Sequence, residues 1–332
     1  MLKKLSLFFL VLIMVMAMGS TGIKAEEIEI GYVTGNMGSD INAIAYEAFE
    51  KFANEKGWEV DLADCQGDVT KFSPNIRNFV NQDVDAIVVF SSEDKLIKGG
   101  AQAAKEAGIP IFLADTENTE STIVNVTSNN WAMGALLGSH IVDRANSMGS
   151  GKHKVALIGM PDLYVHRIRM EMVKSVIGSP EHPNVEVVAT EAVNSSNWQT
   201  ESYNIAQTWL SKYGNELDAI VGTWDGINWG IARAINDAGY TKEDMFSMSI
   251  DGVSKTINMI REGSPIVGVV AQDFGGWVET LGQAIDKAVV QGEDPESFVP
   301  ESRTIYVPHK WIDSTNVPEE GEEINFSYEG MN

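Results

Sequence analysis

The chain has a single cysteine, Cys65, among its 332 residues. One cysteine cannot form a disulfide within the chain, so the fold must be stabilised by packing, and Cys65 is interpreted as a small buried side chain. Basic residues are also scarce, since 24 Lys and Arg stand against 47 Asp and Glu, which gives a net charge of −23. Nucleic-acid binding needs clustered positive charge, so we expect no nucleic-acid partner.

Motifs for nucleotide, metal and hydrolase chemistry are missing as well. The stretch MGSGKH at 148–153 has Asn146 where a phosphate-binding loop has its first glycine. Gly31, Gly35 and Gly38 do not have the spacing of a dinucleotide-binding loop. The five histidines show no metal-ligand spacing, and there is no G-x-S-x-G motif. We therefore expect no metal, no cofactor and no catalysis.

Long apolar runs are missing except near the start. Residues 7–18, LFFLVLIMVMAM, follow the basic MLKK, and small residues continue to Ala25. A membrane-spanning helix needs about 20 apolar residues, and this layout is typical of a cleavable secretory signal peptide. We expect residues 1–25 to be removed and the mature protein to be periplasmic. A retained membrane anchor is the alternative.

The rest of the chain alternates short β-rich runs with helical patterns. One example is INAIAYEAFEKFANEKG at 41–57, where apolar side chains recur at helical spacing and Gly57 fits a helix end. Near-continuous apolar strands between helices predict parallel sheets that are covered on both faces. Ten strands are too many for one ordinary sheet, so we expect two lobes that divide near Asn129. The predicted strands are 27–33, 58–63, 85–90, 109–114, 122–126, 154–159, 185–190, 217–221, 245–250 and 265–271.

The residues that follow these strands are rich in Asp, Asn, Gln and Trp. Ligands of open parallel sheets bind at the carboxyl ends of the strands. Carboxylates and amides pair with hydroxyl groups, and tryptophan rings stack on the apolar faces of sugar rings. The loop GTWDGINWG at 222–230 concentrates these types. Asp40 and Asp225 are explained by helix capping, and Trp229 by packing.

The order of several segments resembles type I periplasmic sugar-binding proteins of ABC transporters, in the ribose- and galactose-binding branch, which share their fold with the ligand domains of lac-repressor-type regulators. The segments that carry the resemblance are NFVNQDVDAIVVFSSEDK (78–95), AAKEAGIPIFLADTE (103–117), VTSNNWAMGALLG (126–138), MPDLYVHRIRM (160–170), SIDGVSKTINMIREG (249–263) and VVAQDFGGWVETLG (269–282).

This resemblance implies an α/β fold of two Rossmann-like lobes joined by a three-strand hinge. The first lobe would comprise 26–129 plus 273–301, and the second 130–272 plus 302–312. Residues 313–332 form an acidic C-terminal tail, expected to be solvated or a loose edge. The matching positions imply ligand contacts from Asp115, Arg167, Trp198, Asp251 and Gln272, and from Ser39 and Asn42 in the first loop.

Two departures from the ribose-binding pattern bear on the ligand. Thr116 stands where the pattern has an arginine, and Trp224 replaces an amide, so Trp224 is a further candidate as a stacking platform. These changes argue against ribose and favour a hexose, a sugar alcohol or a short oligosaccharide.

The resulting expectation is a monomeric substrate-binding protein that delivers a sugar or polyol to an ABC permease in the inner membrane. Two alternatives stay open. The same fold could serve a chemoreceptor or a sensor kinase, with a sugar or an autoinducer-like ligand. A secreted carbohydrate-active enzyme would instead need two carboxylates at a fixed separation across the scissile bond.

Overall fold

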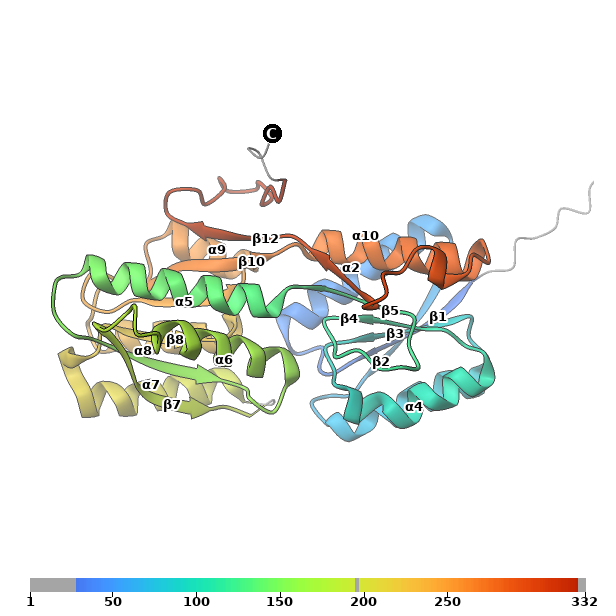
Figure 1. Cartoon of the computed structure of the whole chain (residues 1–332), viewed down its shortest axis with the longest axis horizontal. Helices are drawn as coiled ribbons and strands as arrows, with labels where there is room; N and C mark the ends of the chain where they lie inside the picture. Colours follow the sequence, from blue (N-terminus) through green and yellow to red (C-terminus); the bar gives the residue numbers. More distant parts are fainter. Residues whose placement is uncertain (1–27, 195–196, 328–332) are drawn as a thin grey trace, which may run out of the picture.

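The computed structural model describes residues 28–194 and 197–327, so the expected signal peptide at 1–25 lies outside the described residues. The chain folds into two α/β lobes that lie side by side (Figure 1). Within the described ranges, none of the helices has the length and apolar character needed to span a membrane.

The first lobe contains a six-stranded parallel sheet in the order β11-β5-β4-β3-β1-β2. Helices α2 and α10 pack on one face of this sheet, and α3 and α4 pack on the other. Because both faces are covered, strands such as β3 are buried at every position. Its elements are β1 (Glu29–Thr34), α2 (Asp40–Lys56), β2 (Glu59–Asp64), the 3₁₀ turn Val69–Lys71, α3 (Phe72–Gln82), β3 (Ala86–Phe90), α4 (Asp94–Ala107), β4 (Ile111–Ala114), β5 (Val124–Ser128), α10 (Phe274–Ile285) and β11 (Thr304–Val307).

The second lobe contains the strand groups β7-β6-β8 and β12-β10-β9, which a bridge between Ala219 and Phe246 connects. Helices α5 and α6 cover one face of these strands, and α7 and α8 cover the other. Its elements are α5 (Asn130–Ser147), β6 (His153–Gly159), α6 (Tyr164–Ile177), β7 (Val185–Ala192), α7 (Trp198–Tyr213), β8 (Ala219–Gly222), α8 (Asp225–Asp237), β9 (Ser247–Asp251), α9 (Ser254–Arg261), β10 (Ile266–Gln272) and β12 (His309–Asp313).

The chain crosses between the lobes three times, and we call these crossovers the hinge. They join β5 to α5, β10 to α10 and β11 to β12 (Figure 1). The sequence analysis expects all of 302–312 in the second lobe, but β11 pairs with β5 of the first lobe and only β12 pairs with β10. The third crossover therefore lies at Pro308, between two strands that the sequence pattern did not predict.

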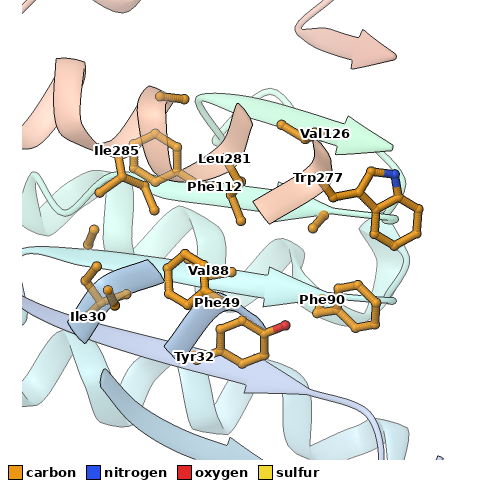
Figure 2. Close-up of a cluster of buried hydrophobic side chains, with 14 of the residues drawn as sticks. Ile30, Tyr32, Phe49, Val88, Phe90, Phe112, Val126, Trp277, Leu281 and Ile285 are labelled. Atoms are coloured by element: carbon orange, nitrogen blue, oxygen red, sulfur yellow. The ribbon is translucent and has the colours of Figure 1, made fainter. Parts of the chain in front are cut away.

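Helix α10 completes the core of the first lobe after the chain has returned from the second. Trp277, Leu281 and Ile285 of α10 lie in one core with Phe112 and Val126 of the sheet (Figure 2). The ring centroid of Trp277 is 5.9 Å from that of Phe90. The Trp277 indole Nε1 donates to the hydroxyl of Ser128 at 3.2 Å, at the start of the first crossover. Packing in this core thereby fixes the hinge end of β5.

The described part of the C-terminal tail lies against the second lobe. Val317, Ile324 and Phe326 pack on an apolar cluster that includes Ile257 and Ile312. Arg261 of α9 also donates to the carbonyl of Pro318 at 2.6 Å. The expected solvated tail is therefore attached by apolar contacts up to Phe326, because its scattered aromatic and aliphatic residues cover an otherwise exposed edge.

Two glycines on α5 bring α6 close to the hinge. A Cβ atom at Gly134 would come within 2.8 Å of the Arg169 carbonyl oxygen, and one at Gly138 would come within 2.8 Å of the Cβ of Val176. Because these glycines lie one helical turn apart, the backbones of α5 and α6 can approach along one face. This close approach carries the side chain of Arg169 to the start of α5.

Candidate functional site

A cavity of about 80 Å³ lies between the lobes at the carboxyl ends of their strands. In the first lobe, the lining residues lie at or after the ends of β1, β2, β3 and β4. In the second lobe, they lie at or after the ends of β6, β8 and β9, or at the start of α7. Both lobes contribute polar and aromatic groups. The polar and aromatic residues of the lining are Asn36, Ser39, Asn42, Phe72, Phe90, Ser91, Asp115, His166, Arg169, Trp198, Trp224 and Asp251.

Contacts between the lobes enclose this cavity. Ile41, at the start of α2, packs against the first-lobe core and also against the second-lobe cluster that contains Met160 and Trp224. Arg167 of α6 lies with its Nη1 3.8 Å from Oε1 of Glu93, which belongs to the first lobe. The lobes are thus in a closed arrangement.

The centre of the site is a chain of hydrogen bonds that runs from one lobe through the hinge to the other. Asp115 Oδ1 accepts from Asn130 Nδ2 at 3.2 Å, and Asn130 Oδ1 accepts from Arg169 Nε at 2.6 Å. Arg169 Nη1 donates to Asp251 Oδ1 at 3.0 Å, and Gln272 Nε2 donates to the same oxygen at 2.8 Å. We call these five residues the interlobe network. These hydrogen bonds hold the two carboxylates and the guanidinium in fixed positions.

Atoms at three points of this network remain for a ligand. Within residues 28–194 and 197–327, no hydrogen bond uses Oδ2 of Asp115, Oδ2 of Asp251 or Nη2 of Arg169. All three residues line the cavity. Two acceptors and one donor fixed in this way match adjacent hydroxyl groups, each of which can donate one hydrogen bond and accept others.

Both aspartates of the network have backbone φ angles in the left-handed region, 47° at Asp115 and 128° at Asp251. Asp115 directly follows the buried strand β4, and Asp251 is the last residue of the buried strand β9. Non-glycine residues adopt such angles rarely, and the associated strain concentrates at ligand-binding sites. The turn at each strand end therefore directs a carboxylate toward the cavity at a cost to backbone energy.

Asp225 has a structural role other than the expected helix cap. Its Oδ1 accepts from the Ser249 hydroxyl at 2.5 Å, and its Oδ2 accepts from the backbone N–H groups of Gly252 and Val253 at 3.0 and 2.9 Å. The carboxylate is thus turned toward the loop after β9 and away from the N–H groups of its own helix. It fixes the turn that presents Asp251.

Burial and charge shift the pKa values of this region. Loss of solvation, with the Asp251 carboxylate adding to it, raises the pKa of Asp225 to about 7. Loss of solvation also raises the pKa of Asp251 to about 6, against the opposing effect of the Arg169 guanidinium. Burial lowers the pKa of His166 well below its usual value, so its imidazole is neutral at pH 7.

Two tryptophans form an aromatic wall on the second-lobe side. The ring centroids of Trp198 and Trp224 are 5.3 Å apart, with planes inclined by 57°. Trp229 does not belong to this wall. It packs in a separate core cluster, as its sequence position predicts, and its Nε1 donates to the Thr256 hydroxyl at 2.9 Å.

The single cysteine, Cys65, is buried, and burial raises its thiol pKa to about 11.

The structure brings most of the predicted site residues to one cavity. Six of the eight line it, namely Ser39, Asn42, Asp115, Trp198, Trp224 and Asp251. Gln272 stands behind the lining and holds Asp251. Arg167 lies outside the lining, where its Nη1 donates to the carbonyl of Pro161 at 2.9 Å. Across residues 28–194 and 197–327, no cluster of three or more His, Cys, Asp or Glu side chains could hold a metal ion.

Arg169 is the central residue that the sequence analysis did not identify. It is only 1% exposed, whereas the side chain of Arg167 is 37% exposed. A signal was available, because Val165 and Val173 lie one turn before and after Arg169 on α6. A charge on the apolar stripe of a helix is buried, and a buried charge needs partners. Asn130 was also missed, since it could not be distinguished from a residue that only begins a helix.

Known proteins resemble this chain in sequence. A family model described as a periplasmic binding protein domain matches residues 30–294. The xylitol-binding protein of Mycolicibacterium smegmatis is 26% identical over 280 residues, which cover 83% of this chain and 76% of that protein. A putative rhizopine-binding protein of Rhizobium meliloti is 24% identical over 269 residues, which cover 79% and 82%.

A solved structure shows the same fold. The crystal structure of an ABC sugar transporter subunit from Rhodobacter sphaeroides aligns with a TM-score of 0.75 and 25% identity, over 87% of this chain and 99% of that one. The expected α/β fold with two lobes and parallel sheets is confirmed. Since the family model spans more than half of the sequence, the chain belongs to the periplasmic binding protein family.

Proposed function

We propose that the protein is the periplasmic substrate-binding component of an ABC importer and that it binds a sugar or polyol between its lobes. The observation that carries this proposal is the interlobe network, which presents two carboxylates and one guanidinium to the cavity between the lobes. The names of the relatives support it, since they include a xylitol-binding protein and a sugar transporter subunit.

The size of the cavity favours a small ligand. Its volume is about 80 Å³, whereas a single buried water needs roughly 10–15 Å³. The space therefore suits one sugar ring or a short polyol. This favours a hexose or sugar alcohol over the short oligosaccharide that the sequence also allowed.

The charges around the cavity favour a neutral ligand. Asp115 and Asp251 stand against one arginine, Arg169, and His166 is held neutral by burial. Sugar acids and sugar phosphates would bring a further negative charge toward two buried carboxylates, which is unfavourable at low effective dielectric. Hydroxyl groups can instead donate to both carboxylates and accept from Arg169.

In the proposed mechanism, the ligand bridges the lobes and stabilises the closed arrangement. A ligand can shift such an equilibrium only by its difference in affinity for the two states. Groups from both lobes supply that difference here, because Asp115 and Asp251 reach the ligand together only when the hinge is closed. The closed monomer then presents both lobes to the permease.

We further propose that the protein is exported through residues 1–25 and that it does not catalyse a reaction. Both cavity carboxylates already accept hydrogen bonds, Asp115 from Asn130 and Asp251 from Arg169 and Gln272. Each carboxylate is held through Oδ1, and its Oδ2 remains as an acceptor for a ligand hydroxyl. A glycosidase would need one of its pair protonated to transfer a proton to the leaving group, whereas Arg169 favours the ionised form of Asp251.

The test is a titration of the purified mature chain with a panel of neutral monosaccharides and sugar alcohols. Ligand carried through purification is first removed by unfolding and refolding. We expect saturable heat in isothermal titration calorimetry and an increase in melting temperature with at least one compound. If no sugar or polyol produces either response, the proposed function is wrong.

A further inference from the structure

The cavity differs in character from its hinge side to its outer side. Strand order gives the direction, because β4 and β9 lie toward the hinge strands, whereas β2 lies at the outer edge of the first sheet and β7 at the outer edge of the second lobe. Asp115 directly follows β4, and Asp251 ends β9, so both lie at the carboxyl ends of hinge-side strands. Charged and hydrogen-bonding groups are therefore concentrated near the hinge.

The outer side of the cavity is apolar. In the first lobe, Val69 and Phe72 follow β2 and line the cavity. In the second lobe, Met160 and Leu163 follow β6, and Trp198 begins the helix after β7. We call Val69, Phe72, Met160 and Leu163 the apolar edge. None of these four side chains can donate a conventional hydrogen bond, and only the weak thioether acceptor of Met160 is polar at all.

The loop after β1, which contains Asn36 and Asn42, also lines the cavity, but it offers a ligand fewer hydrogen-bonding groups than its polar composition suggests. Asn42 Nδ2 donates to the carbonyl of Asn36 at 2.9 Å, and Asn36 Oδ1 accepts from the backbone N–H of Gly38 at 2.9 Å. Both amides are thus partly committed to the fold of their own loop. A ligand hydroxyl directed at the apolar edge would be buried there without a strong partner, which is unfavourable.

We propose that the ligand is a neutral sugar or polyol that carries a methyl-type group, such as a deoxy sugar or an O-methylated polyol, with that group against the apolar edge and its hydroxyls toward the interlobe network. The inference rests on the proposed function and narrows its ligand class. Stacking of Trp198 and Trp224 on a sugar ring does not explain the apolar edge. Val69, Met160 and Leu163 of that edge are aliphatic and cannot stack on a sugar ring.

The inference is tested with pairs of compounds that differ only at the methyl-type group. Suitable pairs are L-fucose with L-galactose, L-rhamnose with L-mannose, and a mono-O-methyl inositol with its parent inositol. Dissociation constants are measured by isothermal titration calorimetry on the refolded mature chain. In at least one pair we expect the methyl-bearing compound to bind tenfold or more tightly than its hydroxylated partner, the range typical of one group in an apolar pocket.

A nearly isosteric variant locates the effect. Val69→Thr introduces a hydroxyl into the apolar edge with little change of shape, so we expect it to reduce the preference for the methyl-bearing compound severalfold. Val80→Thr on α3 is the matched control, because Val80 packs on the same first-lobe core but does not line the cavity. The control is expected to leave the preference unchanged.

The outcomes separate this inference from the proposed function. If the hydroxylated members bind equally well or more tightly in every pair, the inference is overturned and the sugar-binding function stands. An unchanged preference in Val69→Thr would overturn the placement of the methyl-type group at the apolar edge. If none of the compounds binds, and the wider panel of sugars and polyols also fails, then the proposed function itself is wrong.

Discussion

Nη1 of Arg167 in the second lobe lies 3.8 Å from Oε1 of Glu93 in the first. This Glu93 oxygen is buried and accepts no hydrogen bond from the described residues. Its partner across the cleft is thus an arginine that does not line the cavity. Because the pair spans the two lobes, opening of the cleft would break it, and we therefore expect Arg167 to affect ligand binding through closure.

Removing the Arg167 side chain should therefore weaken binding without removing a ligand contact. We expect Arg167→Ala to raise the dissociation constant about fivefold, equivalent to about 1 kcal/mol, the upper range for a partly exposed ion pair. The loss should shrink at high salt, because screening weakens the pair in the wild type. Calorimetric titration at low and high salt measures both effects.

Arg233→Ala is the control for this prediction, because Arg233 pairs with Asp237 on the surface of α8, away from the cleft. It should leave affinity unchanged at both salt concentrations. A loss of affinity larger than a hundredfold in Arg167→Ala would indicate direct ligand contact instead of closure.

Arg169 should be far more sensitive than Arg167. It is buried and connects Asn130 to Asp251. We expect Arg169→Met to lower the free energy of unfolding by about 3–5 kcal/mol, because it leaves a buried carboxylate without its charge partner. Binding should be lost in the same variant. Urea denaturation measures the first effect and calorimetry the second.

A double variant distinguishes the charge from the packing. In Arg169→Met with Asp251→Asn, the uncompensated carboxylate is removed, so we expect part of the lost stability to return while binding stays absent. If the double variant is as unstable as the sum of the two single variants, then the pair does not interact energetically as the 3.0 Å distance implies.

The fold was largely predictable from the sequence because buried parallel strands appear as apolar runs. All ten predicted strands occur in the structure. The two strands that were missed, β11 and β12, are short and mostly half-buried, with polar residues such as His309 and Lys310. Their pairing depends on contacts between distant parts of the chain, which local patterns do not contain.

The site was predictable only in part, for a related reason. Asp115 and Asp251 directly follow the predicted apolar strands 109–114 and 245–250, so their position at the cleft could be inferred. Arg169 reaches the cleft from within a helix, and its place depends on how closely α6 approaches Gly134. Distances between helices of this kind are a property of tertiary packing, so neighbouring arginines on α6 could be confused.

The aromatic wall should dominate the optical response to ligand. Trp198 and Trp224 line the cavity, whereas Trp131 is 48% exposed and lies outside its lining. We expect Trp198→Ala to weaken binding by about 2 kcal/mol, or roughly thirtyfold, as for a buried aromatic anchor. Trp131→Phe should change neither the affinity nor the ligand-induced change in tryptophan fluorescence. A full fluorescence change in Trp198→Phe with Trp224→Phe combined would contradict this assignment.

The stability of the protein should depend on pH through Asp225. The pKa of this fully buried carboxyl is raised to about 7, compared with about 3.9 in an unfolded chain. Between about pH 4 and pH 7 the folded protein therefore keeps a proton that the unfolded chain has lost. Each rise in pH within this window favours unfolding, by at most about 1.4 kcal/mol per pH unit, and above about pH 7 the effect is constant.

The comparison of the wild type with Asp225→Asn reports this titration together with its coupling to the nearby Asp251, because the variant has no proton to lose at position 225. The free energy of unfolding of the wild type, relative to the variant, should fall from about pH 4 to pH 7 and then stay level. Buried His166, whose own pKa is lowered, is present in both proteins, so its contribution largely cancels in the difference. Asp237→Asn, at the exposed end of the same helix, should give a difference without this slope. A stability difference that stays level from about pH 4 to pH 7 would mean that the carboxyl is ionised throughout and held by Ser249, Gly252 and Val253 as a buried charge.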